Sequence, residues 1–378
     1  MTRASARTTR ALLVGAALAG TACSTPAAGP GAGSPSPAPI AAAPAAPTPP
    51  EPPAPTPPHR AERFVDDPAL TLEVRARIKT GVLPKSVHVS PDGRQLWVCN
   101  FGYSGRRNVY VYDTATLARI GVVEFEGNAV EVGFAHAGGH AYVSNFARGT
   151  LEIVDTRSFE VVDEVRRVGQ YPKVVAVAPD DARVYVANWG TGDVAVVDPA
   201  AGRVVAKLDV GRRPRGMAVD ADGTVYVNAM WDHRVQVFDP RAPDTPEATR
   251  PASPRSTIDT CQFPRHAVLD GSGPEPALFV TCSGDDRLRW HGLDGRVLGE
   301  VEVGDNPRSF GLSDDGQWSA VANFDASSVT LVDLAGGRLH TTEIPDTDRI
   351  VGLAVAHGPA LRVFATSWGD NQLIELGL

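Results

Sequence analysis

Several signatures of enzyme chemistry are absent from the 378 residues of this chain. There is no Gly-x-Ser-x-Gly elbow, phosphate-binding loop or dinucleotide fingerprint, and no Cys-x-x-Cys-His haem motif. The nine histidines have no familiar ligand spacing, so the sequence predicts no metal site and no cofactor. These absences give no support to a nucleotide-dependent, haem-binding or zinc-dependent enzyme.

The sequence also lacks a surplus of positive charge. It has 36 basic and 44 acidic residues, a net charge of −8. Removal of residues 1–22, which contain three arginines and no acidic residue, would make the net charge −11. A generic nucleic-acid binder would be basic, so we expect no nucleic-acid partner.

Residues 1–22 are typical of an export signal: basic residues, a short apolar run over 11–19, and small residues before Cys23. This end resembles the bacterial lipobox, in which the cysteine is lipidated, although Gly20 stands where that pattern usually has Leu. The resemblance implies a protein that is lipid-anchored at Cys23 in the bacterial cell envelope, on the periplasmic or surface side. Cleavage after Ala22 or Ala19, which would release a soluble protein, is the alternative.

Residues 23–62 are rich in Ala and Pro and have too little apolar side-chain area to fold. We expect an extended tether that reaches up to roughly 100 Å. The predicted organisation is therefore a signal peptide over 1–22, a disordered tether over 23–62 and one folded domain over 63–378.

The folded domain contains a repeat. An aromatic-Val pair or its equivalent recurs with its second residue at 98, 143, 186, 227, 280, 321 and 365, at intervals of 41 to 53 residues. A unit of about forty residues with four short strands is typical of a propeller blade, so the sequence predicts an all-β, seven-bladed propeller. The last repeat lacks a fourth strand. The segment 72–81 resembles one, and we expect it to close the ring by pairing with the C-terminal strands.

The repeat resembles a known family. One unit is similar to the YVTN repeat: Tyr171-Pro172-Lys173-Val174-Val175-Ala176-Val177-Ala178-Pro179-Asp180, followed by Val184-Tyr185-Val186-Ala187-Asn188. The resemblance covers about residues 66–378. The resemblance to YncE-like and surface-layer-associated propellers implies an extracytoplasmic protein without an assigned enzymatic activity. The wider superfamily includes lactonases, lyases and quinoprotein dehydrogenases, so the fold alone does not define the function.

Five repeats place a basic residue directly after a proline that opens the first strand. Equivalent positions in a propeller approach one axis, so we expect these side chains to meet at one mouth of the channel and to attract an anion. Repeats two and seven have Val130 and Val351 there instead. The alternative is a repeat consensus in which each cation pairs with an Asp of a neighbouring blade. The predicted ligand-binding residues are Lys85, Lys173, Arg215, Arg265 and Arg308.

Aromatic residues follow the second strands on the same face, and we favour blade-to-blade packing over ligand stacking for them. They are Phe101, Phe146, Trp189, Trp231, Phe324 and Trp368. His88, His266 and His357 lie in or next to first strands, where a structural role is favoured over a shared site. Asn100, Asn145, Asn188 and Asn323 are interpreted as buried groups that fix loops.

Three cysteines remain besides Cys23. Cys261 lies just before the first strand of repeat five and Cys282 at the end of its second strand, so the two face each other across a hairpin. An oxidising compartment would allow a disulfide between them. Cys99 is then expected as a small buried residue.

The first functional hypothesis is a monomeric binding or scaffold module. Its partner would be an anionic small molecule, a cell-envelope polymer or another protein, and its only membrane contact a lipid anchor. The second hypothesis is an enzyme of the lactonase or lyase kind that uses a histidine and acidic residues in the channel. The missing His/Asp/Glu constellation favours the first, so we predict no catalytic residues.

Overall fold

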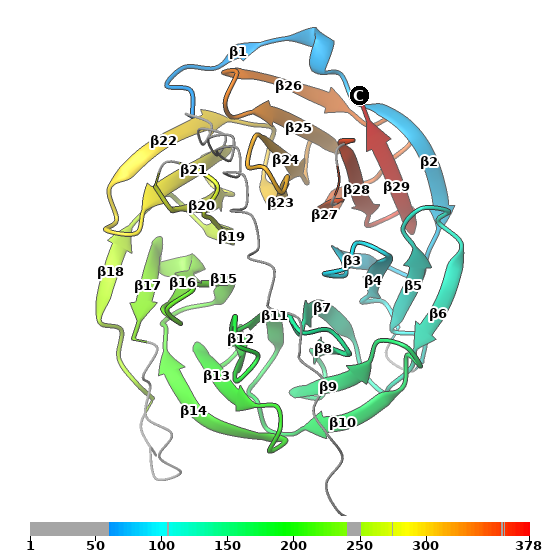
Figure 1. Cartoon of the computed structure of the whole chain (residues 1–378), viewed down its shortest axis with the longest axis vertical. Helices are drawn as coiled ribbons and strands as arrows, with labels where there is room; N and C mark the ends of the chain where they lie inside the picture. The colour runs from blue at the N-terminus through cyan, green and yellow to red at the C-terminus, as the bar shows by residue number, and fades with distance from the viewer. Residues whose placement is uncertain (1–59, 104–105, 240–250, 274, 357, 359) are drawn as a thin grey trace, which may run out of the picture. The chain divides into compact units, whose positions relative to one another are not determined.

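The computed structural model describes residues 60–103, 106–239, 251–273, 275–356, 358 and 360–378. The predicted signal peptide, most of the predicted tether, Cys23 and His357 lie outside the described residues. Strands of the described part form seven sheets arranged as blades around a central axis (Figure 1). The predicted seven-bladed propeller is therefore confirmed.

The innermost strand of each blade faces the axis. Their side chains are partly buried, and alternate residues face the channel and the blade. These strands are β3 (Pro84–Val89), β7 (Ala129–Phe134), β11 (Pro172–Val177), β15 (Pro214–Val219), β19 (Pro264–Asp270), β23 (Pro307–Leu312) and β27 (Ile350–Val355).

The second and third strands form the core, because neighbouring blades cover both of their faces. Their Val, Leu, Ala and aromatic side chains are almost all buried. The second strands are β4 (Gln95–Asn100), β8 (His140–Asn145), β12 (Val184–Asn188), β16 (Val225–Ala229), β20 (Ala277–Cys282), β24 (Trp318–Asn323) and β28 (Arg362–Ser367). The third strands are β5 (Val109–Asp113), β9 (Thr150–Asp155), β13 (Asp193–Asp198), β17 (Arg234–Phe238), β21 (Arg287–Gly292), β25 (Ser328–Asp333) and β29 (Gln372–Gly377).

The fourth strands form the rim and are the most exposed. They are β6 (Arg119–Val123), β10 (Val161–Val165), β14 (Arg203–Asp209), β18 (Ser256–Asp259), β22 (Val297–Glu302), β26 (Arg338–Glu343) and β2 (Glu73–Lys79). Strand β2 comes from the N-terminal side and pairs antiparallel with β29, which completes blade seven. This is the predicted ring closure, and it gives the last blade a fourth strand.

A short segment before β2 follows the rim of blades five and six. The two-residue strand β1 (Val65–Asp66) pairs in parallel with β26, and the Phe64 ring packs edge-on against Trp290. Arg60, predicted to be tether, forms an ion pair with Asp270 and lies over the Phe279 ring. The propeller thus has structural contacts from residue 60 onward.

Helical structure among the described residues consists of two 3-10 turns, Pro68–Leu70 and Met230–Asp232. Within that part of the chain, no helix is long and apolar enough to cross a membrane.

Candidate anion-binding channel

A repeated turn positions the residue that enters the channel. The residue directly before the inner-strand proline has a positive φ, for example 51° at Leu83, 56° at Tyr171 and 55° at Asn306. This conformation is strained for a side-chain-bearing residue before proline. It is held by a hydrogen bond, because the carbonyl of Tyr171 accepts the N–H of Trp189 at 3.1 Å. Six more pairs repeat this bond around the ring, and they are Phe101 with Leu83, Phe146 with Asn128, Met230 with Arg213, Ser283 with Phe263, Phe324 with Asn306 and Trp368 with Arg349.

A β-bulge follows in every blade. The pairing of the first and second strands shifts register within the first residues of all seven inner strands. An extra residue in one strand breaks the alternation of faces, so two consecutive side chains can line the channel. The result is two layers of side chains, one at the position after the proline and one at the next position.

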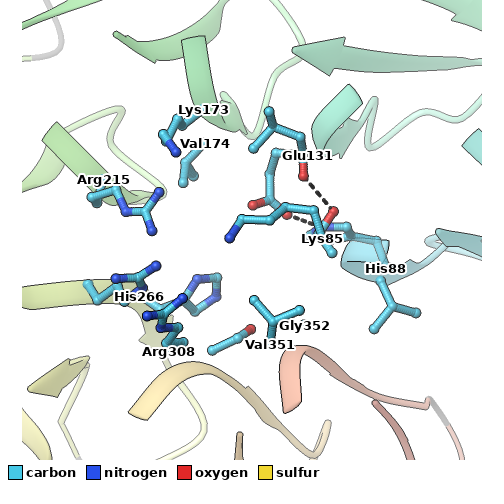
Figure 2. A pocket seen from close by; sticks show the side chains of 15 residues that line it. Lys85, His88, Glu131, Lys173, Val174, Arg215, His266, Arg308, Val351 and Gly352 are labelled. Atoms are coloured by element: carbon cyan, nitrogen blue, oxygen red, sulfur yellow. Dashed lines mark hydrogen bonds and ion pairs between the residues drawn. The ribbon is translucent and has the colours of Figure 1, made fainter. Parts of the chain in front are cut away.

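The first layer contains all five predicted cations. The five side chains line one cavity of about 40 Å³ on the axis, together with Val130 and Val351. Figure 2 shows Lys173, Arg215, Arg308 and Lys85 directed toward the centre of this cavity. The five ligand-binding residues predicted from sequence are thus brought together by five different blades.

The second layer, apart from His266, was missed by the sequence analysis. It contributes Ser86, Glu131, Val174, His266, Ser309 and Gly352 to the same cavity. In blade four the equivalent residue is Gly216, where an added Cβ would lie 2.6 Å from the backbone nitrogen of Ala267. The alignment of the repeats already contained the signal for this layer, one position further along.

None of the five cations has a side-chain hydrogen bond or an ion pair within the described residues. The alternative of pairing with a neighbouring blade's Asp is therefore wrong for these residues. Arg215 is the most enclosed, with 7% of its surface exposed. The Nε of Arg308 is a buried donor without an acceptor among the described residues, and leaving part of a charged group unpaired in this way is costly.

Aromatic rings lie directly beneath the cations. The Lys85 ammonium lies 4.9 Å from the Trp368 ring centre, and Lys173 lies 4.9 Å from Phe146 and 5.1 Å from Trp189. The Arg308 guanidinium lies 3.1 Å from the centre of Phe324. Such contacts stabilise a cation without using its hydrogen-bond donors, which stay free.

The same rings also connect blades, as predicted. Phe101 packs edge-on against Phe146 at 5.3 Å and lies 5.9 Å from Trp368. Phe146 stacks on Tyr171 at 4.7 Å. Trp231 differs, because 42% of its surface is exposed. Among the described residues, Arg213 is the cation that lies over its ring.

Burial and mutual repulsion perturb the cations. Burial, followed by repulsion from Arg215, Arg265 and Arg308, lowers the pKa of Lys173 to about 6. The same causes, burial first, lower the pKa of Lys85 well below its usual value. Burial also lowers the pKa of Arg308 to about 10, with Arg215 adding to the effect. The channel thus contains more positive charge than its surroundings stabilise.

A single carboxylate lines the cavity. Glu131 forms an ion pair with His88 through Oε1. Burial is the largest influence on its pKa and raises it, but His88, His266 and Lys85 together lower that pKa below the usual value. Burial lowers the pKa of His266 to about 4, so this imidazole is neutral at pH 7. His88 and His266 share the cavity, whereas the sequence favoured separate structural roles for them.

The residues next to the cavity have structural roles. Arg212 is paired with Asp232, Arg213 donates to the Trp189 carbonyl, and neither lines the cavity. Asn100 accepts the N–H of Gly81 at 3.0 Å, and Asn188 donates to the Val168 carbonyl at 2.8 Å, as expected for loop-fixing groups.

The described cysteines follow the predicted arrangement. Cys261 and Cys282 form a disulfide with a Cα–Cα distance of 5.5 Å, and Cys99 is buried and free. Within the described residues, no three His, Cys, Asp or Glu side chains are grouped so that they could hold a metal ion.

Comparisons with known proteins agree with this architecture. Residues 64–223 match the family described as YNCE-like beta-propeller. The chain is 26% identical over 195 residues to Antigen Lp49 of Leptospira interrogans serogroup Icterohaemorrhagiae serovar copenhageni (strain Fiocruz L1-130). That match covers 46% of this chain and 42% of the antigen, so the chain matches less than half the length of this relative.

Solved structures show the fold alone. The Myceliophteria thermophila Cps50 (Swd1) β-propeller domain has a TM-score of 0.65 at 13% identity, covering 81% of this chain and 99% of that domain. The Kuenenia stuttgartiensis hydrazine synthase has a TM-score of 0.66 at 16% identity, covering 80% of this chain and 97% of that chain.

Proposed function

Because this chain is a YncE-like β-propeller, we propose that it is an exported binding module whose channel takes up an anionic ligand. The observation that carries the proposal is the set of five converging cations that have no acceptor within the described residues. An anion would supply that acceptor and offset the mutual repulsion of these side chains when they are protonated.

The family match and the similarity to a Leptospira antigen support an extracytoplasmic location. A lipid anchor at Cys23 with a Pro-rich tether would hold the propeller at the cell envelope, within reach of anionic metabolites and polymers. Only a small anion, or the end group of a larger one, fits inside the cavity, so a polymer or protein partner would contact the mouth and its aromatic residues.

The test removes three channel cations, Lys173→Gln, Arg215→Gln and Arg265→Gln, in one variant. Isothermal titration with phosphate, sulfate and citrate should show at least about tenfold weaker binding of the anion that binds wild type best, since each lost charge-assisted bond contributes about 1.5–3 kcal/mol. Added salt should weaken wild-type binding in the same direction. The melting temperature should stay constant or rise, because these cations have no ion pair to lose.

A matched control variant also removes three basic residues, but at exposed positions outside the cavity. It combines Arg94→Gln, Arg157→Gln and Arg203→Gln. It should bind as wild type does. Equal weakening in both variants would mean that only net charge matters, and failure of all three anions to bind wild type would refute the anion site.

A lactonase or lyase remains the second candidate. The observation that favours it is the neutral His266 beside the His88–Glu131 pair in one cavity, since a neutral imidazole can accept a proton. A stoichiometric metal ion in the purified protein, or turnover of lactone substrates that is lost in His266→Gln, would favour this function over binding alone.

A further inference from the structure

We infer that the channel selects a compact oxyanion that carries a proton, of the hydrogen phosphate type, over a fully deprotonated one such as sulfate. This inference rests on the proposed anion-binding function and specifies its ligand. It comes from the position of the one carboxylate of the lining, Glu131, among the cationic side chains of the cavity.

The size of the cavity limits the ligand. A volume of about 40 Å³ holds the centres of roughly three water molecules. One tetrahedral ion matches this space better than a sugar or a peptide. The lining also has far more donors than one ion needs, because the three arginines and two lysines all have free N–H groups.

The carboxylate has one oxygen available. Oε1 of Glu131 is held by Nε2 of His88, and Oε2 has no hydrogen-bond partner within the described residues. The Glu131 side chain is only 14% exposed. The cavity thus places one carboxylate opposite several cationic side chains (Figure 2).

A proton on the ligand decides how it interacts with this acceptor. Hydrogen phosphate can donate its P–O–H to Oε2 while its other oxygens accept from the cations. Sulfate has no proton at neutral pH, so its oxygens would face the carboxylate and be repelled. One hydrogen bond to a charged group contributes about 1.5–3 kcal/mol, which corresponds to roughly a tenfold to hundredfold preference for phosphate.

Glu131 could instead serve only to offset the positive charge of the cations, and Glu131→Gln separates the two roles. If the carboxylate accepts the ligand's proton, the variant should bind sulfate more tightly and phosphate no more tightly, so that the preference falls by at least about tenfold. If it only offsets charge, both anions should gain affinity by the same factor.

The experiment measures phosphate and sulfate affinities of the full chain by isothermal titration, for wild type, Glu131→Gln and Asp325→Asn. Asp325 is the matched control, because its charge acts on Arg265 and Arg308 but it does not line the cavity. Its variant should shift both affinities alike and keep the preference. Melting curves check that each variant is folded.

Two results would overturn the inference while leaving the anion site intact: equal wild-type affinities for the two anions, or a parallel gain for both in Glu131→Gln. If citrate binds but neither phosphate nor sulfate does, the inference is also overturned and the anion site stands. The absence of binding by every anion would overturn the proposed function itself, so the two failures are distinguishable.

Discussion

Lys173 shows how the ring changes the chemistry of a single side chain. In an unfolded chain its ammonium would be charged at every physiological pH, but in the channel burial, followed by repulsion from the neighbouring arginines, lowers its pKa to about 6. Glu131 counteracts this shift only in part. The charge of the site therefore depends on pH.

The shift predicts how stability depends on pH. Between pH 6 and the ordinary lysine value of 10.5, the unfolded chain binds a proton at Lys173 that the folded chain does not. The free energy of unfolding should therefore rise with pH over this window and be lowest below pH 6. Lys173→Met should flatten the rise, measured by denaturant unfolding at pH 6 to 9 without phosphate or sulfate.

Lys207→Met is the control for this measurement, because Lys207 is paired with Asp193 at 2.8 Å and does not line the cavity. Its pH profile should keep the wild-type slope. A Lys173→Met profile that coincides with wild type would contradict the assigned pKa.

Among the elements, the inner strand of each blade has the most specific construction. A strained residue before the proline and a bulge after it turn two consecutive side chains toward the axis. Blade two lacks the proline but keeps both the bulge and the hydrogen bond from Phe146 to Asn128. The bulge, more than the proline, therefore produces the second layer that contains Glu131.

The disulfide of blade five also acts at the scale of the elements, and its effect on stability can be tested. It connects the entry to β19 with the end of β20 and encloses a separation of 21 residues. Loss of such a crosslink lowers the free energy of unfolding by roughly 2–4 kcal/mol. We expect this loss in Cys261→Ala/Cys282→Ala, measured by denaturant unfolding, with Cys99→Ala as the control that keeps the bridge. Two free thiols in non-reduced peptides of the exported protein would contradict the pairing.

At the scale of the whole molecule, the ring depends on pairing between the two ends of the domain. Strand β2 is bonded to β29 along six residue pairs, and the segment before it contacts blades five and six. Closure of this kind gives blade seven its fourth strand and joins the two ends of the domain. Five basic side chains that repel one another when protonated can then be held at fixed positions.

The predicted attachment to the envelope also belongs to this scale. Cys23→Ser should move the protein from the membrane fraction to the soluble fraction, because the lipid chains would be missing. Cys99→Ala, which removes a thiol inside the propeller, should leave the distribution unchanged. Recovery of the wild type in the soluble fraction would contradict the anchor.

The sequence by itself determined the blades. Each blade is built from short alternating runs and turns at a period near forty residues, and these patterns are local, so the number of blades, the closing strand and the convergence of Lys85, Lys173, Arg215, Arg265 and Arg308 could be predicted. The parallel pairing of β1 could not, because a strand of two residues has no pattern of its own.

Only the tertiary structure decided the chemistry of the channel. Whether a cation has a partner depends on side chains from other blades, which are distant in sequence, and no pattern within one repeat records them. The same holds for Glu131, His88 and His266, which reach one cavity from three different blades. Burial and the distance between charges act through space, so the shifted pKa of Lys173 and the free oxygen of Glu131 exist only once the ring is closed.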